Sequence, residues 1–357
     1  MKNGRNITRL AGIATAVLLA LASIAGCERR PLEEASEFVS IRVDVNIKAV
    51  ANVKVDVYNE HIPLPDLNTD MMRVLIYDPT TKNLLSQSFI SSKTYNDEGN
   101  QVLSGTLNIS YGNYDILVYN FDTPTTQVTG EANEYSLLAF TSEGSPALKA
   151  KFLGRTRDEV VSTIDALCYE PDHLVVATEE NFRISPHDTV VVITTEARTI
   201  VDSYYLQIHV EGMQYASTAT AVISGLSPSN HFGLNERTEN PPISVAFDLQ
   251  KSTDPRIPGT NKDVLCAVFN TFGKIPNASS DLHVTFNVID IAGNLVQYET
   301  SLDRIFLTED AIERHWLLID ETWVIPNPNP NPDPSGSGGG FQPTVDDWEE
   351  EHGEIAL

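Results

Sequence analysis

The chain has 357 residues, of which 41% are hydrophobic and 20% charged, and its formal net charge is −25. This apolar content is sufficient for packed cores, and the length predicts about two domains. The excess of 49 acidic over 24 basic residues disfavours nucleic-acid binding and electrostatic docking on anionic lipid, because both need clustered Lys and Arg.

The first segment has the features of a bacterial export signal. Three basic residues within the first nine precede an apolar run at 10–24. That run is too short for a comfortable membrane span, but it has the length of a secretory signal peptide. It ends in Ile24-Ala-Gly-Cys27, which resembles the bacterial lipobox.

The lipobox resemblance implies that Cys27 carries a diacylglycerol, with fatty acids such as palmitate, and begins the mature chain. We therefore expect a signal peptide at 1–26, a lipidated tether at 27–37 and membrane attachment through Cys27. Removing the signal takes away three cations and no acid, which leaves a net charge of −28. The alternative is an uncleaved anchor helix in which Cys27 occurs by chance.

Residues 38–197 have the pattern of a first set of short strands. Apolar residues alternate with polar ones from Val39 to Ile47, the period of a half-buried strand. Gly112-Asn113 between two apolar runs predicts a tight turn. The further apolar runs lie at 53–57, 71–77, 84–90, 102–109, 114–119, 174–177 and 189–194.

Residues 198–325 repeat this pattern. Ala292-Gly-Asn294 predicts a hairpin turn, and the best short helix candidates in the whole chain are 157–167 and 310–318. Short strands separated by Gly, Pro, Asn and Asp predict an all-β fold of two tandem antiparallel β-sandwich domains, divided at about residue 198. The runs lie at 204–210, 216–223, 243–249, 263–269, 282–291, 295–298 and 316–325.

Two further cysteines, Cys168 and Cys266, stand in apolar surroundings. The export route permits a disulfide between them. Their apolar neighbours favour two buried free thiols in separate domains.

The end of the chain changes composition. Residues 326–340 are rich in Pro and Asn and then in Gly and Ser, which predicts a linker that begins as a polyproline II spacer. The tail at 341–357 has six acids and no Lys or Arg. Two interpretations of this tail are open: a segment that docks on a partner, or a frayed terminus. The apolar residues that would contact a partner are Phe341, Val345, Trp348, Ile355 and Leu357.

Together these features resemble the fimbrillin-like lipoproteins of the Bacteroidales. The resemblance rests on the lipobox at Cys27, the strand sequences 72–78 and 107–120, and the tail sequence Val345-Asp-Asp-Trp348. More narrowly, the chain is similar to an uncharacterised domain family that opens with Cys-Glu and an alternating Val/Ile strand. The resemblance implies transthyretin-like sandwiches and a fimbrial shaft, anchor or tip role, with other fimbrial subunits or surface proteins as partners.

Assembly in that family resembles donor-strand addition, in which one subunit's groove accepts an extended segment from the next. The resemblance implies that 341–357 is the donor here. Polymerising members also lose their first strand by cleavage after an Arg. Arg42 lies inside the first strand, and Arg29 and Arg30 lie too close to the lipid to release one. Arg155 and Arg157, in a loop-like stretch, are alternative cleavage sites that match no motif of the family. The pattern therefore favours an uncleaved anchor or accessory subunit.

The sequence contains no recognisable catalytic motif. The eight histidines are scattered without an HExxH pattern, and the sequence has no CxxC pair or glycine-rich phosphate loop. Gly225-Leu-Ser-Pro-Ser lacks the spacing of a nucleophile elbow, and the acidic run at 346–349 lacks EF-hand spacing. We therefore expect no enzyme, no cofactor and no metal site.

The alternative function is a glycan-binding surface lipoprotein of polysaccharide uptake, in which exposed aromatic rings would stack on sugars. The three tryptophans, Trp316, Trp323 and Trp348, all follow residue 310. For either function we expect a lipid-anchored protein of the outer membrane, on the cell surface or on the periplasmic face.

Overall fold

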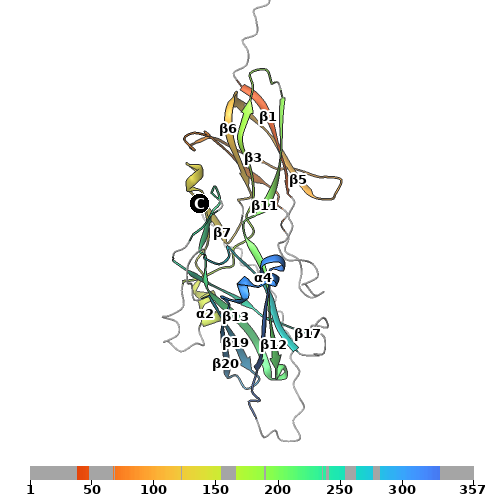
Figure 1. The fold of residues 1–357 in the computed structure, drawn as a ribbon, viewed down its shortest axis with the longest axis vertical. Helices are drawn as coiled ribbons and strands as arrows, with labels where there is room; N and C mark the ends of the chain where they lie inside the picture. Colours follow the sequence, from red (N-terminus) through yellow and green to blue (C-terminus); the bar gives the residue numbers. More distant parts are fainter. Residues whose placement is uncertain are drawn as a thin grey trace, which may run out of the picture.

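The computed structural model describes residues 38–47, 67, 69–121, 123–153, 166–188, 190–234, 236–238, 241–253, 263–275 and 282–329. Within them the chain forms two β-sandwiches stacked end to end along the long axis, with a small sheet at their junction (Figure 1). The predicted all-β fold with two tandem sandwiches is therefore confirmed.

One eight-stranded sheet makes the first sandwich, in the order β3-β2-β6-β10-β11-β1-β5-β4. Strands β10 and β11 share only two register pairs, so the sheet divides there into two halves. Apolar side chains from both halves meet in one core, among them Ile41, Val74 and Val118. The strands are β1 (Phe38–Ile47), β2 (Met72–Tyr77), β3 (Leu84–Ile90), β4 (Ser92–Tyr95), β5 (Gln101–Ser110), β6 (Gly112–Tyr119), β10 (Val175–Ile184) and β11 (Val190–Thr199).

Alternating burial explains why these segments are strands. In β1, Val39 and Ile41 are buried, whereas Ser40 between them is exposed. Gly105 allows a close approach of β5 to β3, because a Cβ at that position would lie 2.5 Å from Cγ2 of Ile90.

Two facing sheets make the second sandwich, in the orders β17-β18-β12-β21 and β20-β19-β13-β16-β9. Leu206, Phe269 and Phe286 belong to the core between them. The strands are β9 (Ala166–Cys168), β12 (Asp202–Glu211), β13 (Ala216–Leu226), β16 (Ile243–Asp248), β17 (Gln250–Thr253), β18 (Asp263–Thr271), β19 (His283–Asp290), β20 (Leu295–Ser301) and β21 (Trp316–Val324).

A single division at residue 198 does not describe the sheets, because β9 pairs with β16 of the second sandwich. Helix α2 (Pro146–Leu153) lies beside it, and Phe152 and Leu167 are buried against Val222 of β13. Burial of these side chains draws a segment that precedes residue 198 onto the second sandwich. Strand β9 and helix α2 are therefore exceptions to the predicted domain bounds 38–197 and 198–325.

The two cysteines are free and buried, as predicted. Their assignment to separate domains is wrong, since Cys168 ends β9 and Cys266 lies in β18, in the two sheets of the second sandwich.

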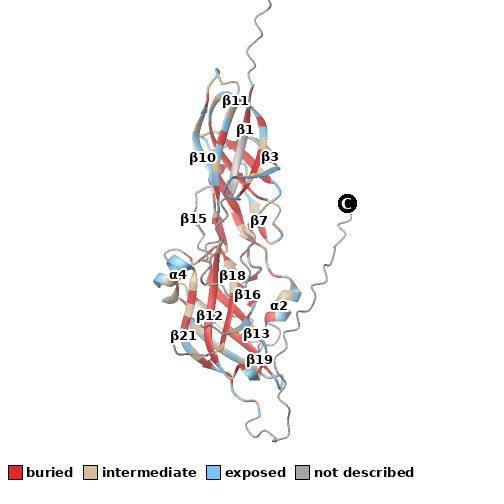
Figure 2. Ribbon diagram, turned by 90° about the vertical axis from the view of Figure 1, so that its right-hand side faces the viewer, coloured by how far each residue is buried: buried red, intermediate tan, exposed pale blue. Residues whose placement is uncertain are grey.

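A four-stranded sheet at the junction draws two strands from each half of the chain, in the order β15-β14-β8-β7. Side chains of this sheet belong to an apolar cluster that includes Phe272. In this cluster the ring of Tyr119 lies 5.5 Å from the ring of Phe232. Buried residues therefore continue from one sandwich into the other (Figure 2). The strands are β7 (Thr126–Thr129), β8 (Leu138–Thr141), β14 (Ser229–His231) and β15 (Glu236–Arg237).

Three strand pairs are parallel, contrary to the expectation of antiparallel sheets: β1 with β11, β12 with β21, and β9 with β16. In the first sandwich the parallel partners β1 and β11 are its first and last strands. Likewise β12 and β21 are the first and last strands of the segment 202–324. The first sandwich and the segment 202–324 thus each join their first and last described strands to one another.

Some local predictions are confirmed and others are wrong. The hairpin turn at 292–294 joins β19 and β20, with Gly293 at φ +85°. The turn at Gly112-Asn113 is wrong, because Gly112 already pairs with Ile184, and β5 and β6 lie in different halves of the sheet.

Helices are short within the described residues. The prediction of a helix at 310–318 holds only for α4 (Glu309–Arg314), because His315 adopts φ +53° and β21 follows. Of the second candidate, 157–167, residues 157–165 lie outside the described residues and Leu167 is in β9. Short 3-10 turns complete the described elements: η2 (Glu134–Ser136), η3 (Met213–Tyr215) and η4 (Ile305–Leu307).

Candidate functional site

Strand β1 fills a groove between β5 and β11 in the first sandwich. It pairs with β5 along Phe38–Ile47 and with β11 along Ser40–Ile47. Val39 and Ile41 enter the core, and Ile41 is completely buried. Backbone hydrogen bonds and two described apolar side chains therefore hold this extended segment, and these are the contacts that an added strand would make.

The outward-facing side chains around β1 are polar toward β5 and apolar toward β11. The Ser40 hydroxyl donates to Asn108 Oδ1 of β5 over 2.7 Å. On the other side, Val190 and Val192 of β11 are 69% and 57% exposed. Arg42 lies inside β1, as the sequence predicted, and its side chain is exposed.

The edge strand β3 presents a second surface for pairing. Leu85 and Phe89 are about half exposed on it, and the Phe89 ring contacts Phe121 with centroids 5.1 Å apart. The Arg73 guanidinium lies 5.6 Å from the centroid of the same ring. A sheet edge of this kind can receive an added strand.

The site residues named from the sequence lie outside the described residues, and they remain predictions. They are the lipidation site Cys27 and the tail residues Phe341, Val345, Trp348, Ile355 and Leu357.

Two of the three tryptophans are described, and neither forms an exposed platform. Trp323 is buried, with its ring 5.8 Å from Tyr298 and 6.1 Å from Phe286. Trp316 is half-buried against the cluster of Tyr205 and Cys266. Trp323 therefore cannot stack on a sugar as the glycan-binding alternative requires, and Trp316 is only partly exposed. Trp348 is outside the described residues.

A polar cluster at the junction brings a serine and a histidine together. The Ser203 hydroxyl donates to Asn270 Oδ1 over 2.8 Å, and its oxygen lies 2.9 Å from His173 Nε2. Ser203 is completely buried. The pair is therefore structural, because a serine nucleophile needs access to substrate and this hydroxyl has none.

Burial shifts the two titratable groups of this cluster in opposite directions. It lowers the pKa of His173 from 6.5 to about 4, against the opposing charge of Asp172. It raises the pKa of Glu170 to about 7, although Asn270 N donates to that carboxylate over 2.9 Å.

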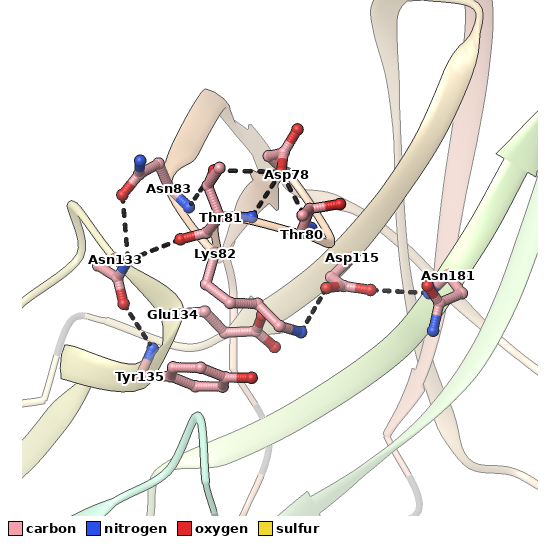
Figure 3. A network of polar contacts seen from close by, with 10 residues as sticks. All are labelled: Asp78, Thr80, Thr81, Lys82, Asn83, Asp115, Asn133, Glu134, Tyr135 and Asn181. Atoms are coloured by element: carbon pink, nitrogen blue, oxygen red, sulfur yellow. Dashed lines mark hydrogen bonds and ion pairs between the residues drawn. The ribbon is translucent and has the colours of Figure 1, made fainter.

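A second polar cluster lies where the β2–β3 turn meets η2 and β6 (Figure 3). Lys82 Nζ lies 2.6 Å from Asp115 Oδ2 and 3.0 Å from Glu134 Oε2. The side chains of these residues are 17%, 3% and 8% exposed, respectively. Asn181 N donates to the other Asp115 oxygen, Oδ1, over 2.7 Å.

The backbone holds this cluster in place. Lys82 has φ +60°, its N–H donates to Asp78 O over 2.8 Å, and its carbonyl accepts from Glu134 N over 2.8 Å. Burial opposes the charged form of Lys82, but hydrogen bonds to Asp115 and Glu134 outweigh it and raise the pKa of the amine. Burial also raises the pKa of Glu134. Sequence reasoning missed this cluster, because its members come from segments far apart in the chain.

The described residues contain no group of three His, Cys, Asp or Glu side chains placed to hold a metal ion. No helix in the described part of the chain is long and apolar enough to cross a membrane.

A family model described as "Domain of unknown function (DUF5119)" matches residues 27–248. A stretch of 126 residues is 22% identical to the "Putative fimbrium anchoring subunit Fim4B" of Bacteroides ovatus, covering 35% of this chain and 34% of that protein. The match thus spans about a third of the length of that curated relative.

Two solved structures are also similar. A "putative adhesin" from Bacteroides ovatus matches 85% of this chain and 98% of its own, with a TM-score of 0.51 and 17% identity. The fimbrial anchor protein Mfa2 from Porphyromonas gingivalis matches 80% of this chain and 90% of its own, with a TM-score of 0.46 and 12% identity. The adhesin structure shares the fold of this chain.

Proposed function

This chain belongs to the family described as Domain of unknown function (DUF5119), and from this premise we propose that it is a non-enzymatic, fimbrillin-like subunit or anchor of a surface fimbria or adhesive assembly. The names of its relatives, a fimbrium anchoring subunit and an adhesin, support this role. Its partners are then other fimbrial subunits or surface proteins.

The position of β1 is the observation that carries the proposal. The first described strand lies as a central strand between β5 and β11 and fills the groove that strand addition would use. Cleavage after Arg42 would cut β1 near its middle and leave residues 43–47 in the groove. This supports a subunit that keeps its own first strand, as an anchor or accessory subunit would.

The proposed attachment is a lipid on Cys27, which places the chain on the outer membrane, at the cell surface or its periplasmic face. A Cys27→Ser variant should then lose incorporation of labelled palmitate and become extractable without detergent. A variant that still takes up the label would overturn the assignment of Cys27. Protease treatment of intact cells distinguishes the two faces, because only a surface-exposed chain is digested.

The proposed contact with a partner is strand donation by the tail at 341–357. Deletion of these residues should reduce the recovery of other fimbrial subunits with the solubilised chain and the number of fimbriae seen by electron microscopy. The matched variant keeps the tail length and acids but replaces its apolar residues by Ser, and it should behave like the deletion. Unchanged recovery and fimbriation in both variants would refute strand donation. The residues replaced are Phe341, Val345, Trp348, Ile355 and Leu357.

A further inference from the structure

The cluster of Lys82, Asp115 and Glu134 has no part in the proposed fimbrial role, and its geometry has a chemical consequence. A primary amine lies 2.6 Å from one carboxylate and 3.0 Å from a second, and both carboxylates are more than nine-tenths buried (Figure 3). Burial of charged groups is costly even when they are paired. An amide between Lys82 and Asp115 would remove one buried positive and one buried negative charge from the cluster.

We propose that Lys82 Nζ and Asp115 Cγ are joined by an intramolecular isopeptide bond, with Glu134 as the proton relay. In this bond the amine nitrogen replaces Asp115 Oδ2, which leaves as water. An ammonium and a carboxylate become one amide and one water, so the reaction needs neither an oxidant nor a reductant.

The steps follow from the contacts. Glu134 takes a proton from the Lys82 ammonium and passes it to Asp115 Oδ2, which leaves a neutral amine beside a neutral carboxyl. The Nζ lone pair then attacks Cγ, and negative charge develops on Oδ1. Glu134 takes a second proton from the nitrogen and delivers it to Oδ2. The Cγ–Oδ2 bond breaks, water leaves and Oδ1 becomes the amide carbonyl oxygen.

Two further contacts support these steps. Asn181 N already donates to Oδ1 over 2.7 Å, where the negative charge develops. Glu134 Oε2 lies 3.0 Å from Lys82 Nζ, within reach of the ammonium proton. Holding the reacting groups in contact removes the entropy cost of bringing them together.

The backbone at this site is also unusual. Lys82 and Asn181 have φ values of +60° and +52°, and they are two of the three described residues other than glycine with positive φ. Such conformations are unfavourable for side-chain-bearing residues and cluster at functional sites. Asn181 stands at the register shift between β10 and β6, which directs its N–H toward Asp115.

A short amine–carboxylate distance alone does not make such a site, and the chain contains its own comparison. Lys151 Nζ lies 2.6 Å from Asp248 Oδ2, but the two side chains are 48% and 57% exposed. Water solvates this pair and would favour the free ions over the amide. We expect Lys151 and Asp248 to remain unlinked.

Peptide mapping of the folded full chain tests the bond. Trypsin should not cleave after Lys82, and peptide 74–93 should be recovered joined to peptide 94–149, with the loss of one water from their summed mass. Cleavage after Lys151 should be normal. Recovery of free peptides 74–82 and 83–93 from the folded wild-type chain would overturn the proposal.

Variants separate the bond from the ion pair. Lys82→Arg keeps the positive charge but cannot form the amide, and Glu134→Gln keeps the shape but removes the relay. Both should give separate peptides, with circular dichroism showing that each remains folded. A folded Glu134→Gln chain that is still fully linked would refute the relay. The measurement detects a covalent bond within the chain, so its outcome does not depend on whether the proposed fimbrial role is correct.

Discussion

The junction cluster predicts a pH dependence of stability in which two opposed contributions cancel. The pKa of Glu170 is raised from 4.5 to about 7, so its contribution is complete below pH 4.5 and is lost as the pH rises through 7. The pKa of His173 is lowered from 6.5 to about 4, so its contribution is complete above pH 6.5 and is lost as the pH falls through 4.

Each shift corresponds to about 3 kcal/mol, from about 1.4 kcal/mol per pKa unit. Between pH 4.5 and 6.5 the two contributions change in opposite directions with equal slope. A Glu170→Gln variant retains only the histidine contribution. Relative to wild type, its free energy of unfolding should therefore rise by about 3 kcal/mol between pH 4.5 and pH 6.5.

Urea unfolding of the full chain at several pH values, with the variant measured beside wild type, provides the assay. His173→Gln is the matched control, and its stability relative to wild type should fall by about the same amount over the same range. A Glu170→Gln difference that does not change between these pH values would refute the assigned burial of the carboxyl group.

Three further predictions concern packing. Gly130→Ala should lower the free energy of unfolding by more than about 2 kcal/mol, because the backbone has φ +81° and a Cβ would lie 1.8 Å from the carbonyl oxygen of Ser136. Gly99 has the same φ but open space, so Gly99→Ala should cost only about 1–2 kcal/mol; equal losses in urea midpoints would contradict the clash. Ile41→Ala should lower the free energy of unfolding by about 2–5 kcal/mol, and a loss below about 1 kcal/mol would show that β1 is not packed in the core. The native thiols of Cys168 and Cys266 should resist alkylation at pH 8 and react after denaturation, because both are buried and burial raises the pKa of Cys168 to about 11; rapid native labelling would contradict this.

The sequence predicted those elements whose signal is local. Residues 84–90 form β3 at the expected bounds, and the turn at 292–294 joins two strands, because alternation and turn chemistry act over a few residues. The helix expected at 310–318 ended early. His315 adopts the left-handed conformation, and β21 then pairs in parallel with a strand that begins over a hundred residues earlier.

What the sequence could not predict depends on contacts between distant segments. β9 has only three residues, and its place is decided by pairing with β16. The same holds for Lys82, Asp115 and Glu134, each an ordinary charged residue in its own segment. These three residues become neighbours only when their segments fold together, and their spacing in the sequence does not predict this contact.

The parallel pairing of terminal strands has a mechanical consequence. In the first sandwich and in the segment 202–324 the first and last described strands run side by side in the same direction, β1 with β11 and β12 with β21. Tension applied at the start of one strand and the end of the other would slide them lengthwise, loading the whole ladder of hydrogen bonds together and not one bond at a time. Resistance to pulling then depends on the rate of unfolding under force and not on equilibrium stability alone. The two stacked sandwiches would thus form a tension-bearing rod between whatever holds their two ends.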